Sequence, residues 1–394
     1  MVYADNAATT KMSRTAIDAM LPYMETHYGN PSSLYRLGQE AAEALQSARE
    51  TVAACLGCTP REITFTSGGS EADNQALISA ARIGERKGKK HIISTAFEHH
   101  AILHTLKKLE KEGFEVELLP VGPTGTITAQ QVADAIRPDT CLVTIMYANN
   151  EIGSILPIAE IGAVCREKGV LFHTDAVQAA GHLHINVNEQ NIDMLSLSGH
   201  KFHGPKGTGV LYARQGIPLT NIIEGGAQER GKRAGTENVP GIMGLAAALK
   251  EACDHIDENT AKVSALRDQL IAGLSQIPHR ALNGDPVHRL PGNVNFCFEG
   301  IEGESLLLLL DQAGICASSG SACTSGSLDP SHVLLAIGRP HEVAHGSLRL
   351  SLCEWNTQED VDHILKEVPR IVAYLRSISP VWKDLTSGKK QFML

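Results

Sequence analysis

The stretch VLFHTDAVQAAGHLHINVNEQNIDMLSLSGHK, residues 170–201, decides the fold. It contains two short apolar runs, VLFHT (170–174) and MLSLS (194–198), and each run ends where polar or charged residues begin. Runs of this length and composition predict buried β-strands. Asp175 directly follows the first run, and Lys201 lies three residues beyond the second. The stretch therefore predicts chemically active side chains at the ends of two neighbouring strands.

The same alternation of strand-like and helix-like segments extends over residues 60–215. Further strands are predicted at residues 63–67, 91–95, 116–121, 141–147 and 209–213. The intervening segments have helix-forming composition and amphipathic spacing, and they predict helices at residues 71–86, 101–112, 129–136 and 158–168. This alternation is typical of an α/β fold with a mostly parallel sheet, in which ligands bind beyond the carboxyl ends of the strands.

The pattern changes after about residue 255. A long charged helix is predicted at residues 257–275, then a strand NVNFCF (293–298), a helix at residues 303–313 and a loop of small residues, ASSGSACTSGS (317–327). We expect two domains. The larger covers residues 15–255, and a smaller C-terminal α/β domain covers residues 256–394 together with residues 1–14.

Composition excludes several classes of protein. The 394 residues are 43% hydrophobic and 20% charged, which is ordinary globular usage. The net charge is -9 and no dense basic run occurs, so nucleic acid is disfavoured as a direct partner. No apolar run approaches the ~18 residues of a membrane-spanning helix, and the N-terminus lacks a signal-peptide pattern. Nine scattered cysteines do not form a disulfide framework, so we expect a cytoplasmic protein without a membrane partner.

Three features at predicted strand ends indicate a site for pyridoxal 5'-phosphate. The strand at residues 63–67 runs into Gly68-Gly69-Ser70 and then a helix, where free N–H groups favour a phosphate. Asp175 offers a carboxylate for the pyridine nitrogen, and Lys201 offers a desolvated amine for a Schiff base. Alone, a glycine pair is more often a turn, and an isolated Asp is more often a helix cap. Together the three supply what this cofactor requires.

Other side chains extend the candidate site. His99 follows the strand at residues 91–95 and would stack on the cofactor ring, although a pair of surface histidines explains this segment equally well. Arg349 lies in a strand-like run, where its fork suits a substrate carboxylate or a structural salt bridge. Cys323 lies in the loop of small residues, which we expect to be mobile because it has little apolar area to hold it. A thiol there has no packing role, and we interpret Cys323 as functional.

Several motifs resemble those of the NifS/IscS-type cysteine desulfurases, which are class V aminotransferase-type enzymes. The likeness runs from DNAATT (5–10) to LRLSL (348–352) and on to Trp382. The motifs that carry it are YGNPSS (28–33), ANNE (148–151), HTDAVQ (173–178), SGHK (198–201), AGTEN (234–238) and SSGSACTSGSLDPSHV (318–333). The last of them is specific for the long-loop group of these enzymes.

The resemblance implies a large pyridoxal-phosphate domain of the aspartate aminotransferase type with a mostly parallel sheet, a smaller C-terminal domain and a homodimer. It also implies a role for each matching position. Lys201 would bind the cofactor aldehyde, Asp175 the ring nitrogen, Gln178 the ring oxygen and His99 the ring face. The cofactor phosphate would be held by Gly69, Ser70, Ser198 and His200, with Thr236 of the second subunit. Asn30, Asn150 and Arg349 would fix the carboxylate end of the substrate, and Cys323 would be the sulfur nucleophile.

The implied activity is conversion of L-cysteine to L-alanine, with the sulfur transferred as a persulfide on Cys323 and His99 moving protons near the sulfur. The acceptor would be an iron–sulfur scaffold or another sulfur-acceptor protein, and the sequence does not specify which. Three positions depart from the family pattern. Gly69-Ser70 replaces Ala-Thr, His100 replaces a frequent Pro, and the tail after Trp382 is short, which leaves scaffold docking open.

Two other readings of the reaction stay open at this stage. An aminotransferase or a selenocysteine lyase would share the cofactor half of the site, and only the Cys323 loop separates them from a desulfurase. A sulfur carrier or assembly scaffold would keep the cysteine loop without the chemistry.

Two motifs suggest zinc but are interpreted otherwise. HEVAH (341–345) matches the zinc-protease pattern HExxH, but Arg339-Pro340 precede it and Gly346 ends it, which leaves no room for a stable helix. CLGC (55–58) lacks a second cysteine pair, and we interpret Gly57 as a helix C-cap. The sequence therefore predicts no resident metal, although Cys323 could transiently bind a metal or cluster.

Overall fold

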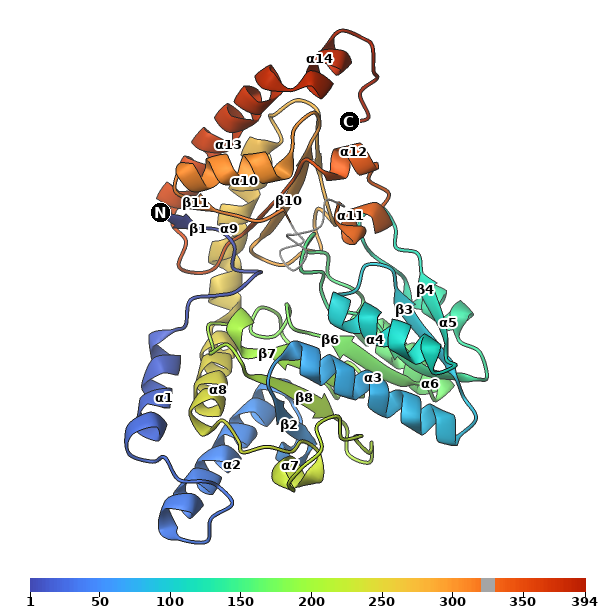
Figure 1. The fold of residues 1–394 in the computed structure, drawn as a ribbon, viewed down its shortest axis with the longest axis vertical. Coiled ribbons are helices and arrows are strands. Elements are labelled where there is room, and N and C mark those ends of the chain that lie inside the picture. The colour runs from blue at the N-terminus through green and yellow to red at the C-terminus, as the bar shows by residue number, and fades with distance from the viewer. Residues whose placement is uncertain (320–329) are drawn as a thin grey trace.

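The computed structural model describes residues 1–319 and 330–394 (Figure 1). Cys323 lies outside the described residues. Within them, no helix combines the length and apolar character that a membrane crossing requires.

A seven-stranded sheet forms the centre of the lower part in Figure 1, in the order β2-β8-β7-β6-β5-β3-β4. All neighbouring pairs are parallel except those of β8, which runs antiparallel to β2 and β7. The strands are β2 (Ile63–Thr66), β3 (His91–Thr95), β4 (Glu115–Leu119), β5 (Thr140–Thr144), β6 (Leu171–Asp175), β7 (Met194–Ser198) and β8 (Gly209–Ala213). The predicted α/β fold with a mostly parallel sheet is confirmed.

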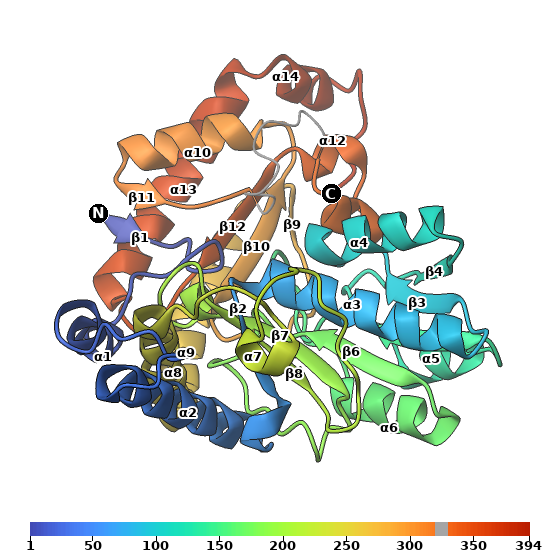
Figure 2. The same ribbon diagram turned by 60° about the horizontal axis from the view of Figure 1, so that its bottom comes forward.

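Helices cover both faces of this sheet because its central strands are apolar on both sides. In β7, Met194 belongs to one buried cluster and Leu195 to the other, as the two-residue period of a strand requires. Helices α3 (Gly69–Arg86) and α4 (His100–Lys111) complete one cluster. The other cluster draws mainly on α2 (Arg36–Leu56), α6 (Ile158–Lys168) and α8 (Val239–Asp254). Figure 2 shows α3 and α6 on opposite sides of the sheet. The remaining helices here are α1 (Arg14–Glu25), α5 (Ala129–Ala135) and α7 (Gln228–Gly231).

A smaller antiparallel sheet, in the order β12-β10-β9, lies in the upper part of Figure 1. Its strands are β9 (Arg280–Leu282), β10 (Asn293–Phe298) and β12 (Ser347–Ser351). A third buried cluster joins this sheet mainly to α9 (Ile256–Leu274), α10 (Gly303–Gln312) and α13 (Gln358–Ile378). The shorter helices nearby are α11 (His332–Ala336), α12 (His341–Ala344) and α14 (Pro380–Thr386).

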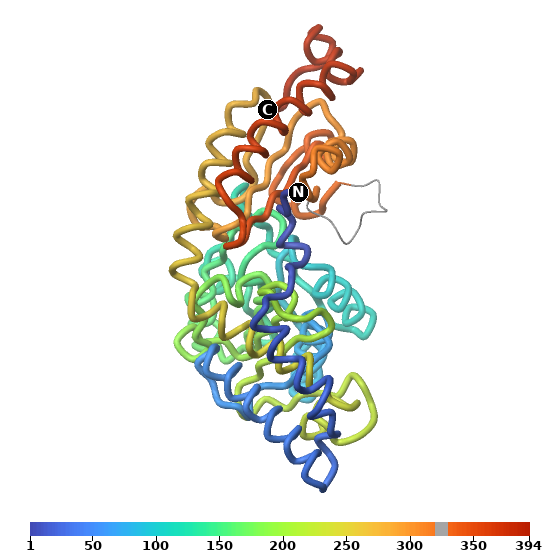
Figure 3. Tube along the Cα trace, turned by 90° about the vertical axis from the view of Figure 1, so that its left-hand side faces the viewer, coloured from blue at the N-terminus to red at the C-terminus, as the bar shows by residue number. Residues whose placement is uncertain are grey.

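The first residues of the chain pack with its C-terminal part. Strand β1 (Val2–Tyr3) pairs in parallel with β11 (Ile315–Cys316), and the Asn6 amide N–H donates to the Ser351 carbonyl at 3.2 Å. Figure 3 shows this segment rising beside the lower part to reach the upper one. The chain then continues through the region between the two sheets into α1.

Most predicted boundaries lie within two residues of the observed ones, and two strands end early for local reasons. The strand predicted at residues 116–121 ends at Leu119, because Pro120 has no N–H for the ladder. The strand predicted at residues 141–147 ends at Thr144, and the apolar residues after it are buried in a loop instead. Gly57 is the C-cap of α2 with φ of 70°, as predicted.

Candidate active site

A cavity of about 390 Å³ opens beyond the carboxyl ends of β6 and β7. It is lined by ten of the residues that the sequence singled out: Gly69, Ser70, His99, Asn150, Asp175, Gln178, Ser198, His200, Lys201 and Arg349. Ala7, Ala8, Asp73, Met146, Ala148 and Val177 complete the lining. Strand ends that are far apart in the sequence therefore meet in one pocket.

One end of the pocket is suited to an anion. Gly69 begins α3, an 18-residue helix whose first N–H groups have no partner within the helix. A Cβ at position 69 would lie 2.6 Å from Val177 Cγ2, so only glycine fits without a shift. The hydroxyl groups of Ser70 and Ser198 lie in the same lining. Backbone donors, a helix N-terminus and two hydroxyls together form a cradle for phosphate.

Lys201 lines the pocket rather than facing bulk water. It ends the short 3-10 turn Gly199–Lys201 that follows β7. Its Nζ donates hydrogen bonds to the carbonyl oxygens of Ala7 at 2.7 Å and Ala8 at 2.8 Å. The amine is therefore positioned by the N-terminal segment, which the sequence analysis did not include in the site.

Asp175 is the last residue of β6 and is 6% exposed. Its Oδ1 accepts the Val177 N–H at 2.9 Å. Burial raises the pKa of Asp175 to about 6, while the Val177 hydrogen bond and the charge of Lys201 oppose the increase. At neutral pH the carboxylate is ionised, and it lines the pocket. Gln178 Nε2 donates to the Ala7 carbonyl at 3.0 Å, which ties this turn to the same N-terminal segment.

Two histidines in the lining are uncharged at neutral pH. Burial, and then the charge of Lys201, lower the pKa of His99 to about 4 and that of His200 to about 4. His99 is the N-cap of α4, where its Nδ1 accepts the Ala101 N–H at 3.1 Å. A neutral ring with an accepting Nδ1 carries its proton on Nε2, so His99 presents a neutral donor and a flat face.

Arg349 stands in β12 and is 1% exposed. Its Nη1 donates to the Asn150 carbonyl at 3.0 Å, and its Nη2 pairs with Asp5 Oδ1 at 2.9 Å. The structural salt bridge considered as the alternative is therefore present, but the guanidinium also lines the pocket. Asp5 begins the motif DNAATT (5–10), but it was not predicted as a site residue.

Sequence analysis missed two buried acids, Asp73 in the lining of the pocket and Glu98, which precedes His99 in the chain. Asp73 is 1% exposed, and burial, followed by the charge of Asp175, raises its pKa well above the ordinary value. Glu98 is 0% exposed, and burial raises its pKa to about 8. Its Oε1 accepts hydrogen bonds from Thr95 Oγ1 at 2.6 Å and the Met146 N–H at 3.1 Å. Asp73 could have been found from the sequence. It lies one turn into α3, on the helix face that packs on the sheet, and a carboxylate on such a face indicates a buried acid.

Replacing Glu98 with glutamine is expected to make folding stability less dependent on pH. The carboxyl has an ordinary pKa of 4.5 and a folded-state pKa of about 8, so in this range the folded state holds a proton that the unfolded state releases. Wild-type stability therefore falls as pH rises from 4.5 to about 8, by at most about 5 kcal/mol from this group. The variant lacks this loss. Its advantage in the free energy of unfolding should grow across that pH range and be absent near pH 4.5.

The control for this measurement is Glu110→Gln, which removes an exposed carboxylate from α4. Urea unfolding followed by circular dichroism at several pH values would give the free energies. A constant difference between Glu98→Gln and wild type across the range would contradict the buried, protonated state of Glu98.

Three predicted site residues are not in this lining. Asn30 is exposed in the connection between α1 and α2, where its Oδ1 accepts the Ser32 N–H at 2.9 Å. Thr236 is exposed in the connection before α8, as expected of a group that would act on a second subunit. Cys323 and the predicted loop around it lie outside the described residues. The assignments of all three stay predictions.

The two zinc-like motifs behave as interpreted. Helix α12 has only four residues and ends before His345, whose ring meets that of His341 edge-on at 4.7 Å. Cys55 and Cys58 flank the C-cap of α2 as free thiols.

The residues present fit pyridoxal 5'-phosphate. The cavity places the phosphate cradle at Gly69, a buried carboxylate at Asp175, a lysine amine and a flat imidazole within one lining. The close approach of Val177 to the backbone at Gly69 and the burial of the Asp175 carboxylate in the pocket are the observations that match this group.

Comparisons with known proteins identify the family. The class V aminotransferase family matches residues 2–364. Cysteine desulfurase IscS of Clostridium botulinum (strain Hall) is 53% identical over 393 residues, which is 99% of each chain. A solved structure titled NifS-like protein superposes with a TM-score of 0.89 at 38% identity, covering 95% of this chain and 100% of the other. A structure titled SspA in complex with cysteine gives 0.80 at 37% identity, covering 91% and 100%. The chain belongs to the class V aminotransferase family, as a pyridoxal-phosphate-dependent cysteine desulfurase of the NifS/IscS type.

Proposed function

We propose that this enzyme converts L-cysteine to L-alanine and carries the released sulfur as a persulfide on Cys323. The observation that supports it best is the joint presence of Lys201, Asp175 and Arg349 in one lining, with the phosphate cradle at the other end. The related structure SspA is titled as a complex with cysteine, which supports the same substrate.

Bound pyridoxal 5'-phosphate supplies an aldehyde for the substrate amino group and a ring that stores the electron pair left at Cα. Gly69, Ser70, Ser198 and His200 would hold its phosphate. Asp175 would hold the ring nitrogen in its protonated form, Gln178 the ring oxygen, and His99 the ring face.

Proton movement falls to Lys201 and His99. Two carbonyl oxygens hold the Lys201 amine at the pocket wall. This position suits the amine to take the Cα proton of the substrate and later to return a proton to the product. His99 is neutral and donates from Nε2, which suits it to stabilise charge that develops near the substrate sulfur.

The sulfur is transferred by a displacement at the substrate sulfur atom. The Cys323 thiolate attacks the substrate sulfur, an S–S bond forms, and the Cβ–S bond breaks. The electron pair of that bond remains with the three-carbon fragment, which is protonated at Cβ and leaves as alanine. No external oxidant is consumed, because the two electrons that the substrate sulfur loses stay with Cβ, which is reduced to the methyl group of alanine.

Arg349 would bind the substrate carboxylate. Its guanidinium is buried and fixed by Asp5 and the Asn150 carbonyl, so it is preorganised for a bidentate contact.

The substitution Arg349→Lys keeps the positive charge but loses the two-pronged guanidinium. The KM for L-cysteine is expected to rise about 10- to 100-fold with a smaller change in kcat. Steady-state kinetics would measure both constants.

The matched control is Arg376→Lys, which alters a buried arginine that donates to the Glu299 and His279 carbonyls far from the pocket. Both variants should be compared by thermal unfolding, so that a change in KM is not confused with partial unfolding. An unchanged KM in a folded Arg349→Lys enzyme would remove Arg349 from substrate binding.

Product analysis separates desulfuration from transamination. Incubation of the purified enzyme with L-cysteine should yield alanine and persulfide sulfur in equal amounts. A keto acid with an aminated acceptor, or strong preference for selenocysteine, would point instead to another reaction of the same fold. A protein that binds cysteine without releasing alanine would be a carrier.

We also propose a homodimer of two-domain subunits with residues 15–255 in the larger domain. The separate buried clusters of the two sheets support the division, and the pairing of β1 with β11 supports grouping residues 1–14 with the smaller domain.

The second subunit of the dimer would cover Thr236. It would also cover the exposed apolar residues Tyr28, Leu34 and Tyr35, which lie near Asn30 in the chain. Sedimentation of the holoenzyme would test this, and a monomer that is fully active would exclude it.

The sulfur acceptor that we propose is an iron–sulfur cluster scaffold in the cytoplasm. Free thiols at all eight described cysteines suit a reducing compartment. Loading the enzyme with labelled cysteine and identifying which protein of a lysate takes the label would test the acceptor. Label on a tRNA-modifying protein instead would redirect the pathway.

A further inference from the structure

A second cluster of chemically active side chains lies outside the pocket just described. His203, Cys353 and Glu354 each direct one potential ligand atom toward a common point, and these atoms lie within 4.8 Å of one another. Among residues 1–319 and 330–394, no other group of three or more His, Cys, Asp or Glu side chains meets this condition. We propose that His203, Cys353 and Glu354 form a zinc-binding site, which the sequence analysis did not anticipate.

The orientation of His203 supports metal ligation. Its Nδ1 lies 2.8 Å from the Lys11 carbonyl oxygen, which can only accept, so Nδ1 carries a proton. In the neutral ring this leaves the lone pair on Nε2. Histidines that bind metals are fixed by such a hydrogen bond from the other ring nitrogen.

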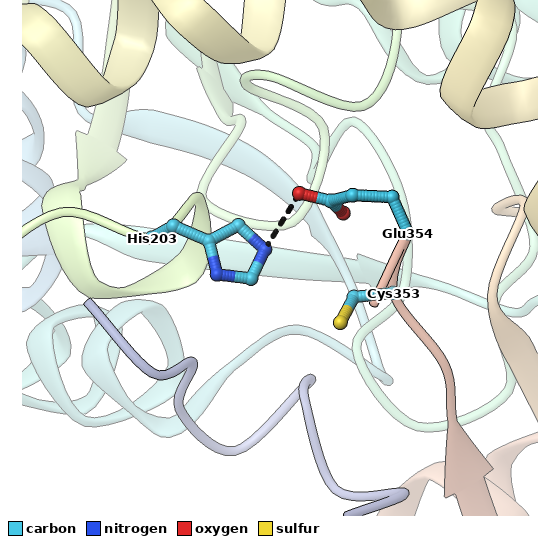
Figure 4. A group of neighbouring side chains, drawn as sticks. All are labelled: His203, Cys353 and Glu354. Atoms are coloured by element: carbon cyan, nitrogen blue, oxygen red, sulfur yellow. Dashed lines mark ion pairs between the residues drawn. The ribbon is translucent and has the colours of Figure 1, made fainter. Parts of the chain in front are cut away.

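Nε2 of His203 is buried and has no hydrogen-bond partner of acceptable geometry among the residues that the structure describes. The nearest carboxylate oxygen of Glu354 is 3.2 Å away, close enough for an ion pair but off the direction of a hydrogen bond. Figure 4 shows Nε2 directed into the space between the Glu354 carboxylate and Cys353 Sγ. An imidazole nitrogen directed into the space between a carboxylate and a cysteine sulfur is the arrangement that a shared cation requires.

The backbone on both sides of the cluster is fixed. His203 has φ of 64°, which is uncommon outside glycine, and its N–H donates to Thr10 Oγ1 at 2.8 Å. On the other side, the Cys353 N–H donates to Asn356 Oδ1 at 2.9 Å. The two ligand-bearing segments are therefore held in place before any ion binds, and closing the ligands to metal distances of ~2.0–2.3 Å needs mainly side-chain movement.

Ligand chemistry, charge and space favour Zn²⁺. One imidazole, one thiolate and one carboxylate are the donor types that zinc takes, and the two anions cancel its charge. Ca²⁺ and Mg²⁺ prefer all-oxygen sites. A cavity of about 30 Å³ borders the three side chains, which is the space of one water as a fourth ligand. Glu354 is 26% exposed at its side chain, which gives an ion a way in.

The competing state is a proton in place of the metal. Burial lowers the pKa of His203, but the close approach of the Cys353 and Glu354 side chains outweighs burial and raises the pKa to about 10. Without zinc the cluster is then an imidazolium held by Glu354. A zinc site takes up metal and needs Cys353 and Glu354 to do so, whereas the protonated ion pair takes up none. An experiment can therefore separate the two states.

The test uses the holoenzyme carrying Cys323→Ala, so that the loop thiol binds no metal. After chelation and removal of the chelator, dialysis against micromolar Zn²⁺ and gel filtration should leave one zinc per chain by mass spectrometry. Adding Cys353→Ser should weaken binding at least about 100-fold, because it removes the thiolate ligand. The matched control Cys316→Ser changes a partly buried thiol outside the cluster and should retain the zinc.

A second variant protects the test against misfolding of Cys353→Ser. Glu354→Gln alters a partly exposed side chain, keeps its size and should also weaken zinc binding at least about tenfold. Cobalt in place of zinc should give the visible absorption of a cobalt–thiolate bond, which Cys353→Ser abolishes. No zinc uptake by the parent, or equal uptake by Glu354→Gln and the parent, would overturn the proposal and leave the protonated ion pair.

Discussion

Replacing Lys201 with alanine is expected to give a colourless protein that retains its fold and loses at least about 10⁴-fold in activity. The variant loses both the covalent attachment of the cofactor and the base for the Cα proton. The amine is the pocket's one lysine and is fixed between two carbonyl oxygens, so no other amine in the described lining can replace it. Absorption spectra of the purified protein and alanine release from cysteine are the measurements.

The matched control for this prediction is Lys206→Ala. Lys206 lies five residues further along the same segment, but its side chain is exposed and outside the lining. The control should keep the colour and the activity. A yellow Lys201→Ala protein with normal turnover would refute the assignment of Lys201 and, with it, the proposed reaction.

Replacing Cys323 with alanine is expected to separate cofactor binding from sulfur transfer. The ten predicted residues of the lining are unchanged in this variant, so the colour and its change on adding cysteine should persist. Formation of persulfide and of alanine should fall at least about 10³-fold, because the sulfur nucleophile is missing. Mass spectrometry of the protein after cysteine addition would detect the added sulfur atom.

Cys316→Ala is the control here, since Cys316 lies seven residues before Cys323 in β11 and outside the lining. It should carry sulfur on Cys323 as the wild type does. Normal sulfide release by Cys323→Ala would show that the sulfur leaves by another route and would remove Cys323 from the reaction.

Much of the sheet was predictable because its strands are short, apolar and separated by amphipathic helices. The direction of β8 could also have been read from the sequence. Only residues 199–208 separate β7 from β8, and a parallel crossover needs about a dozen residues or more. The short link therefore forces the antiparallel pairing that the overall pattern did not suggest.

The side chains of the pocket were predictable where they follow strands, as Asp175 and Lys201 do. The contributions of Ala7 and Ala8 were not, because a backbone carbonyl has no residue type by which to identify it. Their partner Lys201 is also more than 190 positions away along the chain. The cluster around His203 was missed for a related reason, since Cys353 and Glu354 follow β12, 150 positions further along the chain.

The pairing of β1 with β11 and of Asp5 with Arg349 has a consequence for how the protein is made. Residues 2–5 are made long before residues 315 and 349, and they must wait for these partners before they can take their places. At ~5–20 residues per second this delay is on the order of 20–70 s. During this delay the N-terminal segment is not yet fixed by β11 and Arg349, so the Ala7 and Ala8 carbonyls that hold the Lys201 amine take their places only after Arg349 has been made.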